Sequence, residues 1–157
     1  TTADDELCRI IEPNVCPTSR RAEVLNILRD EGIPTVVWFS PVLPFINDTV
    51  EHVRGILDLC FEAKVQGILS FGMGVTLREG DREYFYQALD RYFPGVKQQY
   101  IHTFGLSYEC ASLRNAELMQ LFHQECEAHG IMHQPDEIFR YLHAFPQRDA
   151  GEQLSMF

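Results

Sequence analysis

The sequence predicts an α/β fold with parallel strands and amphipathic helices. Two short apolar runs, residues 35–40 and 65–71, are rich in β-branched and aromatic residues, as in strands that are covered on both faces. Helical patterns lie between and after these runs, and strands that alternate with helices form βαβ units with a parallel sheet. Two clear strands are few for a complete sheet, so we expect the chain to be one domain, 1–157, of a larger fold.

Each predicted helix is bounded by a residue that favours a helix end. Thr18 or Ser19 is expected to cap the first long helix, and Gly32 suits the positive φ that often follows a helix. Asp81 is expected to cap the third long helix, and Pro135 suits the first turn of the last one. After a short helical turn at 5–10, the predicted helices cover 18–31, 49–64, 81–93, 113–129 and 135–143.

Three connecting segments complete the predicted fold. Residues 72–74, Gly-Met-Gly, follow the second strand and are expected to form a flexible loop where the backbone can approach a ligand. Residues 96–112 are rich in aromatic side chains and are expected to form a packed loop. Residues 131–133 are expected to be a short extended piece, and Leu154 and Phe157 of the tail are expected to dock on the domain.

The stretch after the first strand is the main candidate for a site. Pro41 and Pro44 prevent the strand from continuing within a sheet, and Asn47 and Asp48 are expected to cap the second long helix. Helix capping alone would account for Asp48. In α/β folds, however, the loops at the carboxyl ends of parallel strands bind ligands. The sequence therefore places a candidate ligand site on residues 40–48.

The composition restricts the partners and the compartment. A formal net charge of −10 gives no support for binding to nucleic acid or to anionic membranes, and no apolar run is long enough to span a bilayer. The five cysteines are odd in number and widely spaced, with no CxxC pair, which is typical of reduced thiols in a cytoplasmic protein. We therefore expect a cytoplasmic protein without a membrane partner.

Several short motifs occur in an order that resembles a known family. They are Thr2-x-Asp4-Asp5-x-Leu7, Glu12-Pro13, Arg21 at the start of a helix, Glu31-Gly32-Ile33, Pro41-Val42-Leu43-Pro44-x-x-Asn47-Asp48, Phe93-Pro94-Gly95, Gly130-Ile131 and Gln153-Leu154-Ser155-Met156-Phe157. This order resembles the radical S-adenosylmethionine (Fe-S oxidoreductase) proteins of the spore photoproduct lyase-like group. The block from Glu12 to Asp48 is the most specific part, and the later motifs count only in their order.

The resemblance implies a partial (β/α)6 TIM-like barrel, of which this chain would be the C-terminal part. In that family a CxxxCxxC loop holds a 4Fe-4S cluster, which cleaves S-adenosylmethionine to a radical that abstracts hydrogen from the substrate. This chain has no CxxxCxxC. We therefore expect it to form part of the cofactor and substrate wall, to be inactive alone and to hold no tightly bound cofactor. The expected partners are the missing N-terminal half of the barrel or a second copy joined through the exposed sheet edge.

The resemblance also implies which residues lie at the cofactor. They are Arg21, Ser40, Pro41, Asn47, Asp48 and Gly72. Arg21 is expected to pair with the methionyl carboxylate, because a guanidinium can hold a carboxylate with two hydrogen bonds. Residues 40–48 are expected to approach the adenosine and methionyl parts, and Gly72 the adenine. The resemblance assigns no catalytic residue and no metal ligand to this chain.

One alternative function is a non-enzymatic α/β binding or interaction module, with or without a structural zinc. A Cx15Cx2Hx3H pattern is formed by Cys110, Cys126, His129 and His133. Gly130 is expected to end the helix before His133, which disfavours this zinc site. His123 and Cys126 also lie one helical turn apart, as in a nucleophile pair, but no oxyanion donor or orienting acid is evident.

Overall fold

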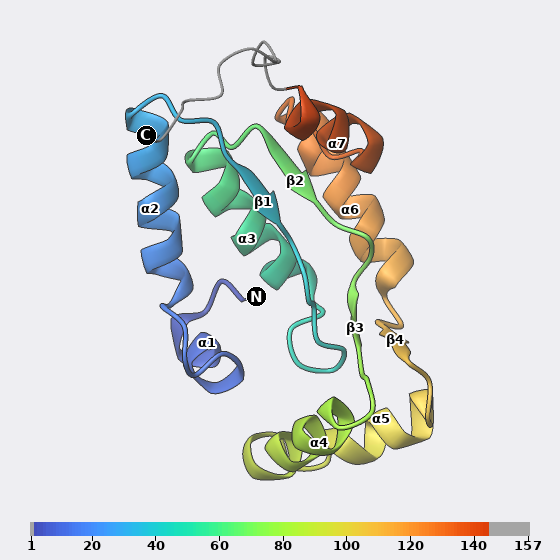
Figure 1. Ribbon diagram of the computed structural model, residues 1–157. Helices are drawn as coiled ribbons and strands as arrows, with labels where there is room; N and C mark the ends of the chain where they lie inside the picture. Colours follow the sequence, from blue (N-terminus) through green and yellow to red (C-terminus); the bar gives the residue numbers. More distant parts are fainter. Residues whose placement is uncertain (1, 145–157) are drawn as a thin grey trace, which may run out of the picture.

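The computed structural model describes residues 2–144 as a mixed α/β fold with short strands (Figure 1), which confirms the predicted class. In chain order the elements are α1 (Asp5–Ile11), α2 (Thr18–Asp30), β1 (Val36–Trp38), α3 (Val50–Glu62), β2 (Gly67–Leu69), β3 (Gly74–Thr76), α4 (Asp81–Tyr92), α5 (Val96–Phe104), β4 (Glu109–Ala111), α6 (Asn115–Ala128) and α7 (Pro135–His143). Within 2–144 no helix is both long and apolar enough to cross a membrane. The docking expected for Leu154 and Phe157 lies outside the described residues.

β1 and β2 form the parallel pair that the sequence predicts. Val36 lies opposite Gly67, and α3 connects the two strands. Met132 forms a parallel bridge with Gly67, so the extended piece expected at 131–133 lies beside β2. A Cβ on Gly67 would lie 3.2 Å from the carbonyl oxygen of Met132, and the glycine therefore permits this close approach.

The expectation of parallel strands is wrong for β3 and β4. These strands pair antiparallel, with Val75 opposite Cys110. The flexible loop expected at 72–74 is also wrong, because Met73 is buried and Gly74 is the first residue of β3. A Cβ on Gly74 would lie only 2.7 Å from the carbonyl oxygen of Cys110. This glycine therefore allows tight strand pairing and does not provide a flexible loop.

Residues 96–112 are not the packed loop that their composition suggested, because they contain α5 and β4. Gly105 ends α5 with a φ of 54°. The Arg82 guanidinium of α4 donates hydrogen bonds to the carbonyl oxygens of Gly105, Leu106 and Ser107, at 3.3, 3.3 and 2.6 Å. A cation at this position also favours the carboxyl end of α5. Because Arg82 lies in another helix, the local sequence pattern gave no sign of this cap.

Three helix caps differ from the expected ones. Thr49 caps α3 in place of Asn47 or Asp48, and its hydroxyl accepts a backbone hydrogen bond from the first turn at 3.2 Å. Pro17 and Gly80, which offer no capping side chain, take the cap positions of α2 and α4 in place of their expected neighbours. The capping rules therefore located the helix starts to within one or two residues but named the wrong side chains.

Two hydrophobic clusters hold the described residues together. The first, the sheet cluster, lies between the parallel strands, α3 and α6, and its large buried members include Phe39, Leu57, Ile68, Leu118 and Phe122. The second, the Tyr100 cluster, lies among α4, α5, β3 and β4, and Tyr100 is fully buried in it. Loop 41–48 contributes to both clusters, because Val42 belongs to the first and Phe45 packs against the second.

Helices α3 and α6 pack on one face of the parallel sheet. In Figure 1, α3 lies behind β1. Val37 and Phe39 point into the sheet cluster on this side. Because side chains alternate along a strand, Trp38 points to the opposite face, where it is 58% exposed and where Phe71 is 65% exposed. The ring of Phe139 in α7 stacks on Phe71 with a centroid distance of 6.4 Å. We call Trp38, Phe71 and Phe139 the open face.

Candidate functional site

The carboxyl ends of β1 and β2 form one rim of the sheet, and the fold brings the predicted site residues to this rim. Figure 1 shows that loop 41–48 follows β1 there and that α2 and α3 begin at the same end. Arg21 is in the first turn of α2, and Gly72 follows β2 by three residues. The placement agrees with the general position of ligand sites in parallel α/β folds.

Side chains within loop 41–48 hold its backbone in place. The Asn47 Oδ1 accepts a hydrogen bond from the Leu43 N–H at 2.6 Å, and Asn47 is 2% exposed. The Asp48 Oδ1 accepts one from the Phe45 N–H at 2.8 Å. The side chains of Asn47 and Asp48, for which the sequence predicts a position at a cofactor, therefore also support the backbone of the loop.

Asp48 also ties the loop to the segment between β4 and α6. Its Oδ2 accepts a hydrogen bond of 2.6 Å from the Ser112 hydroxyl, and Ser112 is 5% exposed. The Ser112 Oγ in turn accepts the Arg114 N–H at 3.0 Å. Sequence reasoning missed Ser112 because 64 positions separate it from Asp48 and no local pattern connects them.

Gly72 marks the point where the start of α6 approaches the end of β2. Its φ is 136°, and a Cβ on it would lie 3.3 Å from the Asn115 Oδ1. The same oxygen accepts the Met73 N–H at 2.7 Å. Only a glycine combines this φ with so close a neighbour without strain. The Gly72 backbone is therefore held by α6 at the position where the sequence predicts an adenine contact.

Arg21 is already paired with groups of this chain. Its guanidinium donates to the Glu12 Oε2 at 2.6 Å and to the Cys8 Sγ at 3.2 Å, and its Nε donates to the Cys16 carbonyl at 3.1 Å. Burial is the largest single influence on Glu12 and raises its pKa, but the hydrogen bond and the charge of Arg21, together with smaller favourable contacts, outweigh burial, so the pKa of Glu12 is lowered. A methionyl carboxylate would therefore have to share the Arg21 guanidinium with Glu12.

The open face begins where β1 reaches the rim. Ser40 and Pro41 are exposed there and are joined by a cis peptide bond. The rings of Trp38 and Phe71 pack edge to face with centroids 5.7 Å apart, and Phe139 extends the row. Exposed aromatic rings in contact with one another form a surface on which an apolar or planar group can pack.

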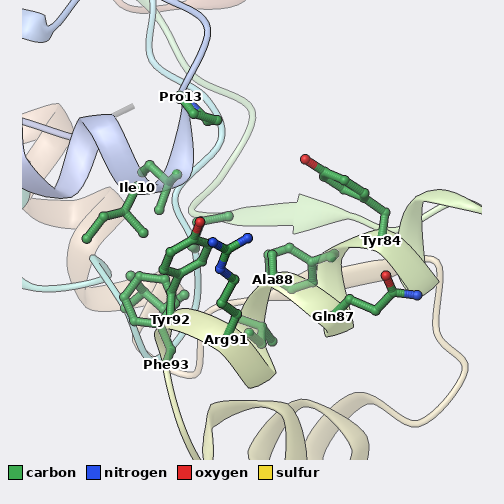
Figure 2. A pocket seen from close by; sticks show the side chains of 13 residues that line it. Ile10, Pro13, Tyr84, Gln87, Ala88, Arg91, Tyr92 and Phe93 are labelled. Atoms are coloured by element: carbon green, nitrogen blue, oxygen red, sulfur yellow. The ribbon is translucent and has the colours of Figure 1, made fainter.

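A cavity of about 340 Å³ lies among loop 41–48, α1 and α4 (Figure 2). Leu43 and Ile46 of the loop form part of its largely apolar wall. Figure 2 shows Arg91 beside Tyr92, and the guanidinium carbon lies 5.0 Å from the centre of the tyrosine ring. The volume is within the range of small-molecule pockets. A cation beside apolar walls suits an apolar molecule with a negative group, and sequence reasoning missed the cavity because three separate segments build it.

The cysteine and histidine pattern considered for zinc does not come together. Cys110 lies in the Tyr100 cluster and Cys126 in the sheet cluster, and the His129 ring stacks on Phe61 with centroids 3.8 Å apart. Among residues 2–144 no three His, Cys, Asp or Glu side chains are grouped as a metal site. Burial raises the pKa of Cys126 to about 12, so its thiol is also a poor nucleophile beside His123.

Comparison with known proteins finds relatives that carry no functional name. Three curated proteins, one from Mycobacterium bovis and two from strains of Mycobacterium tuberculosis, are each 30% identical to this chain over 97 residues. All three are named only as uncharacterized proteins. The matched part covers 62% of this chain but spans only 28% of the length of each relative. No family model matches the chain, and no solved structure matches it.

Proposed function

We propose that this chain is part of a radical S-adenosylmethionine enzyme of lyase or oxidoreductase type, in which it forms the C-terminal wall of a partial barrel. The observation that carries the proposal is the parallel sheet, which has α3 and α6 on one face and the exposed rings of Trp38 and Phe71 beside the rim on the other. On that second face α7 packs against β2. Barrel walls have helices outside and ligand loops at the carboxyl ends of their strands. The ordered motifs from Glu12 to Asp48 supply the choice of family.

The contacts at the rim divide the expected cofactor residues by role. Ser40 and Pro41, which are exposed, and the backbone at Gly72 are the groups proposed to face S-adenosylmethionine. Asn47 and Asp48 are proposed to position the loop that carries those contacts, because their oxygens are occupied by backbone and Ser112 hydrogen bonds.

The residues of this chain do not fit the 4Fe-4S cluster. The chain has no CxxxCxxC, and Cys60 and Cys126 are buried in the sheet cluster, where burial raises the pKa of each thiol to about 12. Cluster ligands are thiolates. In this proposal the cluster and the radical chemistry therefore belong to the N-terminal half of the barrel, and this chain supplies binding surface.

The test is the coding sequence upstream of Thr1 and the activity of the protein that it encodes. We expect a CxxxCxxC motif there, and we expect the anaerobically reconstituted, reduced protein to convert S-adenosylmethionine to 5′-deoxyadenosine. The isolated chain should bind S-adenosylmethionine weakly or not at all. A longer reading frame without the motif, or a reconstituted protein that forms no 5′-deoxyadenosine, would contradict the proposal.

A matched pair of glycine variants tests the role of the rim within that longer protein. Gly72→Ala should raise the KM for S-adenosylmethionine, because the new methyl group meets Asn115 at the end of β2. Gly80→Ala is the control, because Gly80 also has a positive φ but no atom lies within 4 Å of its Cβ position. An equal effect of both variants on KM would show that the rim is not part of the cofactor site.

The second candidate is a non-enzymatic interaction module, and the open face is the observation that favours it. Among residues 2–144, β1 pairs only with β2, so its other edge has no strand partner. Trp38 is the single tryptophan of the sequence and is 58% exposed. If two copies associate through this edge and face, the Trp38 emission should shift to the blue as concentration rises, together with a dimer in sedimentation. A monomer with constant emission would contradict this candidate.

A further inference from the structure

His123 of α6, which is half-buried, and His133, which is buried and follows the bridge at Met132, form a histidine pair away from the rim. Their ring centroids are 5.1 Å apart, and His133 is 8% exposed. The His123 Nδ1 and the His133 Nε2 are both buried and have no hydrogen-bond partner among the described residues. Buried polar atoms are nearly always partnered, so two orphaned nitrogens in adjacent rings need an explanation.

The backbone determines which nitrogen of His133 carries the lone pair. The His133 Nδ1 lies 3.0 Å from the Ile131 carbonyl oxygen. A carbonyl oxygen can only accept, so Nδ1 is protonated and donates, and the lone pair of the neutral ring is on Nε2. Histidines that bind metals usually hold their other ring N–H in this way, through a carbonyl or a carboxylate.

The spacing of the two rings suits one shared metal ion. Two imidazoles bound to the same tetrahedral ion at about 2.0 Å place their ring centroids about 5 Å apart. The Glu127 carboxylate, one helical turn after His123, lies 3.9 Å from the His133 Nε2 and adds negative charge beside the pair.

We propose that His123 and His133 form a two-histidine binding site for a borderline transition-metal ion such as Zn²⁺. The ion occupies the two orphaned lone pairs, and water completes its coordination on the side of the exposed Glu127. The site differs from the Cx15Cx2Hx3H pattern, because Cys110 and Cys126 lie in other surroundings and take no part. It is also independent of the proposed barrel and its cofactor.

Equilibrium dialysis with ZnCl2 at pH 7.5 tests the site, with the full chain carrying Cys16→Ser to remove the exposed thiol. We expect about one Zn²⁺ per chain and a rise in Tm on binding. His123→Gln and His133→Gln should each weaken binding at least about tenfold, since they remove a ligand. His102→Gln, which removes an exposed histidine from α5, is the control and should bind Zn²⁺ as before.

His133 is buried, so its variant is interpreted only if its circular dichroism matches that of the parent chain, and the more exposed His123 variant must show the loss by itself. Co²⁺ substitution gives an independent readout, with visible d–d bands that disappear in the His123→Gln protein. No saturable Zn²⁺ binding in the parent, or binding that His123→Gln leaves unchanged, would overturn the proposal.

Discussion

Asp48 ties loop 41–48 to the segment between β4 and α6, and its removal should be costly. Its two carboxylate oxygens accept hydrogen bonds from the Phe45 N–H at 2.8 Å and from the Ser112 hydroxyl at 2.6 Å. Asp48→Ala removes both acceptors and leaves the 5%-exposed Ser112 hydroxyl and the Phe45 N–H without these partners. Loop 41–48 then loses its link to the start of α6.

The expected loss follows from the two contacts. A hydrogen bond to a charged group contributes about 1.5–3 kcal/mol. Because Asp48 is partly exposed, we take the lower value for each bond and expect Asp48→Ala to reduce the free energy of unfolding by about 3 kcal/mol. Asp48→Asn is the matched variant. Its amide oxygen can still accept from Phe45 and its NH2 can donate to the Ser112 Oγ, so we expect a loss below about 1 kcal/mol.

Urea unfolding followed by circular dichroism measures both variants. A double-mutant cycle with Ser112→Ala isolates the Asp48–Ser112 contact, for which we expect a coupling of about 1 kcal/mol. Equal losses for Asp48→Ala and Asp48→Asn, or additivity within about 0.5 kcal/mol in the cycle, would refute this account of the loop.

Three further predictions follow from contacts described above. Gly74→Ala should destabilise the β3–β4 pair, because its Cβ would lie 2.7 Å from a β4 carbonyl oxygen; an unchanged midpoint in urea unfolding would contradict this. Iodoacetamide should alkylate Cys16 of the folded chain first, since the other four cysteines are buried; mass spectrometry showing equal labelling would contradict this. Arg21 lowers the pKa of Glu12, so the stability from this pair should be complete above about pH 5 and decline toward pH 3. Arg21→Gln should flatten this decline in urea midpoints, and an unchanged pH profile would show that the pair does not contribute.

Local sequence patterns predicted the parallel strands and the described helices other than α5 well. The apolar runs at 35–40 and 65–71 contain β1 and β2, and the helix at 113–129 is found as α6 with ends shifted by one or two residues. Each of these elements has a repeat that reflects which of its faces is buried, so a short window of sequence contains the needed information.

The errors arose where distant residues decide the local structure. Gly74 looks like a loop residue in the sequence. In the structure it is a glycine because β4, which lies more than 30 residues later, packs too close for a Cβ. Asp48 resembles a helix cap, but its partners are Phe45 and Ser112. The rim could be predicted from strand order alone, whereas the cavity beside Arg91 could not, because its walls come from three segments. Sequence patterns therefore located the rim but did not assign the contacts within it.

Loop 41–48 inserts Val42 into the sheet cluster and Phe45 into the Tyr100 cluster. The two clusters therefore should not unfold independently. Unfolding of either cluster would remove the packing of one side chain of this short loop. A ligand that binds to this loop would change the rates of amide hydrogen exchange in both α5 and β1, although these elements belong to different clusters. Loop 41–48 should therefore make the sheet cluster and the Tyr100 cluster unfold as one cooperative unit. Ligand binding at the rim would affect α4 and α5 through this loop.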